Sequence, residues 1–378
     1  MQDLILTNLS KIRDLKVISR SSMEKYASHP ENLKVVGAEL GVAHLLEGSV
    51  QRVGDQVLIN LQLIEVATDS HLWAETYNRK IENVFEVEQE VANAVAKALH
   101  IQLTTPQAIA VRARQAANPQ ALDAFMRAEF AAMELGRRPA RVKNVEAIEW
   151  YEKAIAADPN FALAYAQLTR ALMEAHYFGG VTQYSATQLT ARAEQALATA
   201  RRLQPDLPEA DLALSFIQSR AQMDFIGSIA TLDRVIAAWP GDPRAYLGKA
   251  ANLRHLGRFD EALTELDTAL SLSPRDENLL YRRAQTLTWL RRFDEAEAVY
   301  RQMLELFPRG AALVPLATLV LQRRGDLDEV LALLPPDYGP ATYWRAWLLA
   351  RQGKLRKAWK QPNPWIRATP SPAFQNRA

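Results

Sequence analysis

The 378-residue sequence contains no cysteine, and only 8% of its residues are aromatic. The missing thiols exclude disulfides, thiolate metal sites and a cysteine nucleophile. The sequence also has no large excess of one charge, since its 45 Lys and Arg residues are nearly balanced by 43 Asp and Glu residues. A net charge of +2 gives no whole-chain attraction to nucleic acid or to an anionic membrane.

Long apolar runs are missing as well. The most conspicuous one, residues 310–322, contains Pro315 and is shorter than the roughly 20 apolar residues that span a bilayer. The N-terminal stretch MQDLILTNLSKIRDLK carries polar and charged residues throughout, unlike a secretion signal. No membrane span is therefore predicted, and the compartment is left open between cytoplasm and periplasm.

Alanine is what the sequence has in abundance, and its distribution is uneven. Only nine alanines fall in residues 1–105, and their density about doubles in the rest of the chain. Such a change in composition predicts two architectures in series. The fold class that we expect is an α+β domain with a small mixed sheet, followed by an all-α solenoid.

Residues 1–104 alternate between helical and extended patterns. Apolar residues at helical spacing predict helices, whereas strict alternation, as in residues 56–66, predicts strands. Gly54-Asp55 is a hairpin turn signal, and Gly41 ends a helix. The predicted helices are residues 2–14, 32–40 and 84–103, and the predicted strands are residues 15–19, 42–53, 56–66 and 71–77.

Three segments of this region resemble the TolB amino-terminal-like, FlgO-like domain: residues 5–20, 39–79 and 84–99. The stretches LEGSV (46–50) and LWAE (72–75) are the most specific parts of the match. In that family a strand and a loop precede the first helix, whereas this chain begins inside the helix. The resemblance therefore implies a domain in residues 1–104 that lacks its first strand. Either the chain is a fragment of a longer protein or its gene is truncated, and truncation is favoured because the remaining sheet has an unpaired edge. Members commonly follow a cyclase, kinase or winged-helix domain.

An internal repeat marks the second half of the chain. Residues 257–274 (GRFDEALTELDTALSLSP) align without gaps with residues 291–308 (RRFDEAEAVYRQMLELFP). Small residues recur where two helices must approach closely, for example Ala262 and Ala296. The two closing prolines are separated by about 34 residues, which resembles the period of the tetratricopeptide repeat (TPR), a helical hairpin.

Weaker copies end at Pro159, Pro205 and Pro240. The step from Pro159 to Pro205 is longer than the later steps, which predicts an insertion near residues 177–181, between two helices. We expect five clear repeats and one or two degenerate ones, more than the three needed for a stable stack. The predicted organisation is residues 1–104 as the α+β domain, 105–119 as a linker, 120–360 as repeats and 361–378 as a Pro-rich basic tail.

Motifs for catalysis, cofactors and metals are absent from the sequence: there is no GxxxxGK[ST], GxGxxG, HExxH or GxSxG. The six histidines share no ligand-like spacing. Three acidic pairs, Asp260-Glu261, Asp294-Glu295 and Asp328-Glu329, suit helix N-termini better than paired catalytic acids. We predict a chain that is not an enzyme and binds no cofactor.

The TPR resemblance implies a groove lined by the first helix of each repeat. An Arg- and aromatic-rich groove suits a protein or peptide partner. Leu247 and Ala251 replace the Lys/Asn pattern that clamps chaperone tails, so chaperone binding is disfavoured. The predicted partner-binding residues are Arg244, Leu247, Arg254, Asn278, Tyr281, Arg282, Gln285 and Trp289.

Residues 341–378 hold eight basic residues, no acidic one and four tryptophans. This composition could bind nucleic acid through phosphate contacts and stacking, but a degenerate repeat helix and a disordered tail explain it better. The favoured hypothesis is a protein-interaction scaffold. The alternative is the regulatory C-terminal region of a bacterial adenylate cyclase, kinase or transcriptional regulator whose effector domain lies outside the chain. The oligomeric state is left open.

Overall fold

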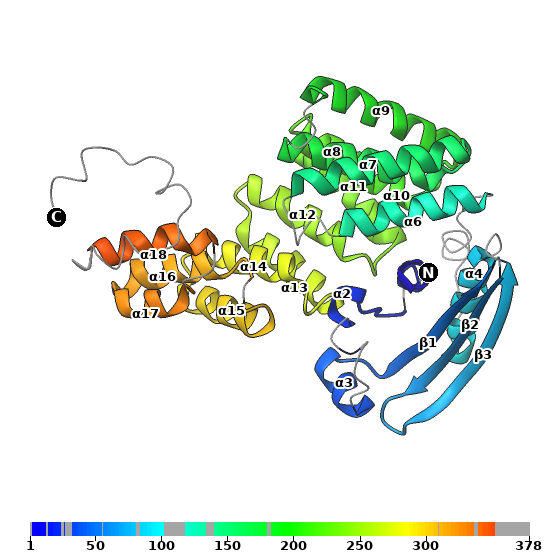
Figure 1. Cartoon of the computed structure of the whole chain (residues 1–378), viewed down its shortest axis with the longest axis horizontal. Coiled ribbons are helices and arrows are strands. Elements are labelled where there is room, and N and C mark those ends of the chain that lie inside the picture. Colours follow the sequence, from blue (N-terminus) through cyan, green and yellow to red (C-terminus); the bar gives the residue numbers. More distant parts are fainter. Residues whose placement is uncertain are drawn as a thin grey trace. The chain divides into compact units, whose positions relative to one another are not determined.

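The computed structural model describes residues 2–12, 14–23, 26, 32–54, 56–80, 84–101, 118–133, 140–179, 183–308, 310–335 and 339–351 (Figure 1). The chain divides into two compact units, residues 1–276 and 277–378. The first unit holds the sheet and the first four described helix pairs of the repeats. The second holds the remaining helices.

The sheet of the first unit has three antiparallel strands in the order β1-β2-β3: His44–Val53, Gln56–Glu65 and Ser70–Lys80. Gly54 adopts a positive φ of 65° in the β1–β2 turn, as the hairpin signal predicts. Gly48 pairs with Leu61, and Ile59 pairs with Tyr77. This confirms an α+β start to the chain.

The alternation of β2 decides which face of the sheet is covered. Val57, Ile59, Leu61 and Leu63 are buried on one face. Helices α1 (Gln2–Ser10) and α4 (Val84–Ala98) pack against them. Each such apolar side chain contributes about 1.5–3 kcal/mol when buried. The opposite face carries polar side chains such as Asn60, which accepts a hydrogen bond from Thr76.

Helix α3 (Leu33–Leu40) begins and ends where the sequence predicts. The Asn32 side chain accepts a hydrogen bond from the Lys34 amide, and Gly41 closes the helix in the left-handed conformation with φ 63°.

The strand predicted at residues 15–19 is wrong, because this segment has no regular secondary structure. Its Ser19 amide donates instead to the carbonyl of Leu272 at 3.1 Å, which lies in the repeats. Ile18 is buried against Val36, Leu40 and other residues around α3. Tertiary contacts therefore satisfy the backbone in place of a neighbouring strand. A short helix, α2 (Arg20–Met23), follows.

Two predicted helices are shorter than expected. Helix α1 ends at Ser10 instead of Asp14. Helix α4 ends at Ala98, and His100 beyond it has a positive φ of 56°.

Paired helices make up the rest of the described chain, in agreement with the predicted solenoid (Figure 1). In the first unit the pairs are α6 (Pro119–Met133) with α7 (Ala140–Ala157), α8 (Ala162–Phe178) with α9 (Ala186–Leu203), α10 (Pro208–Arg220) with α11 (Phe225–Ala238), and α12 (Pro243–His255) with α13 (Phe259–Leu272). In the second unit α14 (Glu277–Trp289) pairs with α15 (Phe293–Leu306) and α16 (Leu313–Arg324) with α17 (Leu327–Leu333), and α18 (Gly339–Arg351) follows.

The alanines lie where helices approach each other. Ala147, Ala193, Ala262, Ala284 and Ala296 are all fully buried, with 0% exposure. This confirms that small side chains at the repeat positions allow close helix packing. Of the insertion predicted near residues 177–181, Tyr177 and Phe178 lie within α8, and residues 180 and 181 lie outside the described residues. Much of the extra length of this repeat lies in its helices, since α8 and α9 have 17 and 18 residues where α12 and α13 have 13 and 14.

Candidate protein-binding surface

Three predicted groove residues lie on α12, in the first unit. Arg244, Leu247 and Arg254 are spaced by three and seven residues, which places them along one helix face, and all are half-buried. Arg244 is held by its neighbour: its Nε lies 2.9 Å and its Nη2 2.9 Å from the two carboxylate oxygens of buried Asp242. The Asp242 carboxylate also caps α12 through the Arg244 amide.

The other five predicted residues lie on α14, in the second unit. Their spacing places them on one face: Asn278, Tyr281, Arg282, Gln285 and Trp289. The Tyr281 ring packs edge-on against Tyr300 at 6.5 Å between centroids. The Arg282 guanidinium lies 6.0 Å from the Tyr281 ring and donates to Gln285 Oε1 at 3.4 Å.

Trp289 is half-exposed, at 50%, and Asn278 is exposed. The α14 face therefore combines an aromatic ring, a guanidinium and amides. Such side chains can bind peptide backbone and apolar side chains together. We call Arg244, Leu247 and Arg254 the α12 stripe, and the five residues on α14 the α14 stripe. The assignment of both stripes to a partner-binding groove stays a prediction.

The acidic pairs take the helix-start positions expected of them. Asp260-Glu261 lie in the first turn of α13, Asp294-Glu295 in the first turn of α15, and Asp328-Glu329 in the first turn of α17. A hydrogen bond from Arg258 lowers the pKa of Glu261, and one from Arg292 lowers the pKa of Glu295. These carboxylates serve helix ends and local ion pairs.

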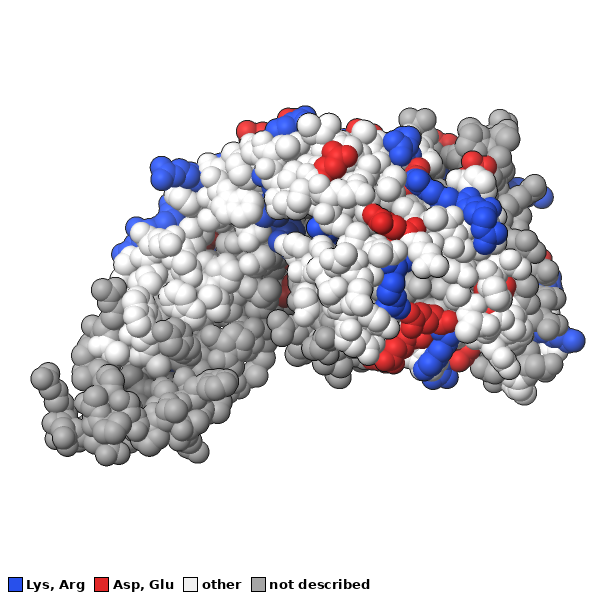
Figure 2. All heavy atoms as spheres, turned by 90° about the horizontal axis from the view of Figure 1, so that it is seen from above, with Lys and Arg blue, Asp and Glu red and all other residues white. Residues whose placement is uncertain are grey.

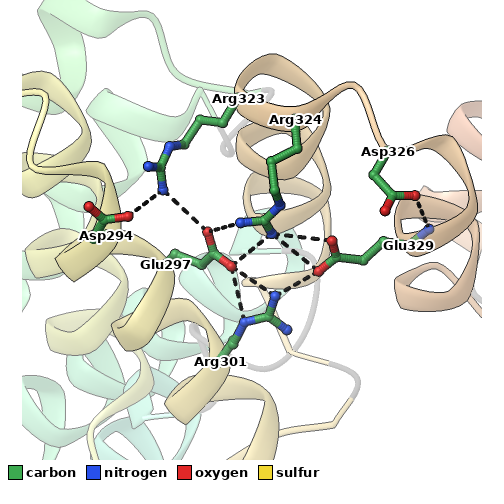
Figure 3. A network of polar contacts seen from close by, with 7 residues as sticks. All are labelled: Asp294, Glu297, Arg301, Arg323, Arg324, Asp326 and Glu329. Carbon is green, nitrogen blue, oxygen red and sulfur yellow. Dashed lines mark hydrogen bonds and ion pairs between the residues drawn. The ribbon is translucent and has the colours of Figure 1, made fainter.

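Figure 3 shows an ion-pair network that joins α15, α16 and α17 in the second unit. Glu297 is its centre, with a side chain only 12% exposed. Its carboxylate accepts from Arg324 at 2.9 and 3.0 Å and from Arg301 at 2.8 Å. Arg301 and Arg324 also contact Glu329, at 2.7 and 3.2 Å, and Arg323 contacts Asp294 at 2.7 Å.

Replacing Glu297 by glutamine is expected to lower the free energy of unfolding of the second unit by about 1–3 kcal/mol at pH 7, because the negative charge between the arginines is lost and one acceptor oxygen becomes an NH2 donor. Hydrogen bonds from Arg324, partly opposed by burial, hold the pKa of Glu297 below its usual value. The carboxylate therefore stabilises the fold at neutral pH, and this contribution is lost as the pH falls through the lowered pKa. Urea titrations at pH 7 and pH 3 measure it. An unchanged gap between wild type and Glu297→Gln at pH 3 would contradict the assignment.

Several contacts of the first unit could not be predicted from any pattern in the sequence. Lys249 on α12 reaches Asp233 and Glu265, each at 2.8 Å, and so ties α11 to α13. Lys11, after α1, pairs with Glu209 on α10 at 3.0 Å, although both side chains are almost fully buried. A lysine in an amphipathic segment is normally expected in solvent.

The apolar residues around β1 leave an open cleft of about 1380 Å³ in the first unit. Its lining includes Leu9, Leu15, Leu45, Leu63 and Val95. β1 pairs with β2 along one edge, and the described residues place no strand along the other.

Charge is dispersed over one face of the molecule. On the face seen in Figure 2, acidic and basic side chains lie interspersed between wide uncharged areas. Among the described residues no group of His, Asp and Glu could hold a metal ion, and no described helix is long and apolar enough to cross a membrane. The predicted basic tail at 361–378 lies outside the described residues, and Trp344 packs edge-on against Trp347 in α18.

Comparison with known families identifies the repeats. Two tetratricopeptide repeat profiles match residues 220–277 and 253–319. These residues cover α11 to α15 completely and α16 as far as residue 319, so the chain carries TPR repeats. The resemblance of residues 1–104 to the TolB amino-terminal-like domain stays a prediction.

A Rhizobium meliloti (strain 1021) protein named "Putative adenylate cyclase 3" is 32% identical over 197 residues, which are 52% of this chain and 33% of that protein. The match thus spans about a third of the relative. Among solved structures, TTC0263, a TPR protein of Thermus thermophilus, is 18% identical with a TM-score of 0.43, covering 53% of this chain and 99% of that one. PilF of Pseudomonas aeruginosa is 16% identical with a TM-score of 0.42, covering 56% and 93%.

Proposed function

We propose that this chain is a non-enzymatic interaction module whose repeats bind a protein or peptide partner. The observation that carries the proposal is the α14 stripe, where Tyr281, Arg282 and half-exposed Trp289 share one helix face. Aromatic and arginine side chains dominate the binding energy of protein interfaces. TPR repeats are typical of protein–protein interaction, which supports the proposal that they bind a partner.

The double variant Arg254→Glu/Tyr281→Ala is expected to recover at least tenfold less partner than wild type in a pull-down with the full chain, because hot-spot truncations cost about 2 kcal/mol or more. Arg202→Glu, on the exposed face of α9, is the charge-matched control and should leave recovery unchanged. Equal recovery by the groove variant and the control would refute the groove assignment.

A second candidate function has its own support. The likeness to part of an adenylate-cyclase relative and the resemblance of residues 1–104 to the TolB amino-terminal-like domain favour the regulatory C-terminal region of a bacterial signalling protein. In this proposal the repeats bind the molecule that carries the signal, and a cyclase, kinase or winged-helix domain of the same protein produces the response.

The DNA upstream of the Met1 codon tests this second candidate. An open reading frame in phase that encodes such an effector domain is the expected result. A stop codon in phase directly ahead of Met1, with no effector gene adjacent, would contradict it.

A further inference from the structure

The segment from the end of α1 to α2 contacts two turns of the first unit, one between α11 and α12 and the other after α13. At the α11–α12 turn, the Trp239 indole N–H donates to Ser10 Oγ at 2.6 Å, and the Gly241 amide donates to the Ser10 carbonyl at 3.2 Å. At the end of α13, the Leu272 carbonyl accepts from the Ser19 amide at 3.1 Å, and the Arg275 amide donates to Ser22 Oγ at 3.1 Å.

These two turns occupy equivalent positions of the repeat. Gly241 and Arg275 are one repeat period apart, and each follows the proline that ends a second helix, Pro240 or Pro274. Both use the same backbone amide to hold the N-terminal segment. Each turn thus presents one backbone N–H donor at the same position of the repeat. Ser10 accepts from the first of these donors and Ser22 from the second.

A buried acidic site formed by Glu209 of α10 also contacts the N-terminal segment. Lys11 and Glu209 have side chains only 2% and 4% exposed, and Lys11 Nζ lies 3.0 Å from Glu209 Oε1. The Lys11 ammonium lies 5.2 Å from the centroid of the buried Trp239 ring. Because removing one partner of a buried ion pair leaves the other charge uncompensated, the site selects a cation at this position.

Glycine is needed at position 241 because Ser10 lies so close, and not because the backbone there adopts a conformation that favours glycine. Gly241 is absent from the glycines with positive φ. A Cβ at this position would lie 2.3 Å from the Ser10 carbonyl oxygen and 2.9 Å from Ser10 Cα. Any side chain here would therefore push the bound segment away.

We propose that the inter-repeat turns at Trp239–Asp242 and Leu272–Arg275, together with Glu209 of α10, form a docking surface for a segment that carries a small hydroxyl residue followed by lysine. The chain's own Ser10, Lys11, Ser19 and Ser22 occupy this surface and hold the α+β domain on the repeats. A partner segment with the same pair competes for the site and releases the domain. Arg244 of the proposed groove contacts the first turn through Asp242 and Trp239, so the two surfaces adjoin there.

Lysine acetylation of the full chain, read by mass spectrometry, tests the occupancy. We expect buried Lys11 to react about tenfold or more slowly than exposed Lys34 and Lys97, because reaction needs local opening. Gly241→Ala should bring Lys11 close to the rate of the exposed lysines. The matched control is Gly248→Ala, whose added methyl meets only the Leu232 side chain at 3.3 Å and should leave Lys11 slow.

A fluorescein-labelled peptide of residues 2–16 tests recognition in trans by fluorescence anisotropy. The full-length variant Lys11→Glu, which loses its own cation, should bind the peptide at least tenfold more tightly than wild type does, because the site is vacated. The peptide carrying Lys11→Glu should bind at least tenfold more weakly. The double variant Lys11→Glu/Gly241→Ala should not bind, because the methyl group blocks the incoming segment as well.

Two results would overturn the proposal. One is acetylation of Lys11 in wild type at the rate of Lys34. The other is equal binding of the two peptides by the Lys11→Glu protein. Neither experiment involves Arg254 or Tyr281, so failure here is distinct from failure of the groove. Because Gly241→Ala changes no residue of the N-terminal segment itself, the occupancy test stands even if Lys11→Glu perturbs that segment.

Discussion

Trp239→Ala is expected to lower the free energy of unfolding of the first unit by about 3–5 kcal/mol, the usual cost of truncating a buried aromatic side chain to alanine. Trp239 is 2% exposed, its indole N–H donates to Ser10, and the Lys11 and Arg244 cations both lie 5.2 Å from its ring. Truncation therefore leaves a cavity and removes a contact shared by the N-terminal segment and the repeats. A urea titration followed by circular dichroism measures the loss.

Trp239→Phe is the control that separates the ring from its N–H group. It retains most of the packing and loses the hydrogen bond to Ser10, so a loss of about 1–2 kcal/mol is expected. Equal stability of wild type and Trp239→Ala would show that the side chain is not buried between the α+β domain and the repeats.

Ala296→Leu is expected to destabilise the second unit by about 1–3 kcal/mol, because the added atoms enter a helix contact that has no room for them. Ala296 is 0% exposed on α15. Ala298, two residues along the same helix, is exposed. Ala298→Leu should change stability by less than about 0.5 kcal/mol. Equal effects of the two substitutions in urea titrations would contradict the explanation given for the alanine excess.

The repeats could be predicted from the sequence because their determinants are local. A helical hairpin packs mainly on itself and its neighbours, so the buried alanines and the helix-ending prolines recur at a fixed period. The sheet could be predicted for a similar reason: β2 alternates in register with its covered face. Each of these patterns is complete within about one repeat or one hairpin.

The contacts of the N-terminal segment could not be predicted in this way. Ser10 and Trp239 are 229 positions apart, and Ser22 and Arg275 are 253 apart. The β-branched and apolar residues at 15–19 indicate a strand, but their conformation is decided by those distant contacts. Tertiary structure overrides local propensity here.

The sequence predicts some features of the candidate site and not others. The helical spacing of Tyr281, Gln285 and Trp289 predicts a shared face, and the structure places all three on the single helix α14. The binding of Arg244 by Asp242 was not predicted, because the Asp242-Pro243 pair indicates only a helix start.

The most direct test of partner binding by the repeats uses the absence of cysteine in this chain. A single cysteine introduced as Gln285→Cys on the α14 stripe, or as Gln302→Cys on the exposed face of α15, accepts one benzophenone photo-crosslinker on the full chain. We predict a discrete crosslinked partner from Gln285→Cys and none from Gln302→Cys. Equal crosslinking at both positions, or crosslinking at Gln302→Cys alone, would contradict binding through the α14 face.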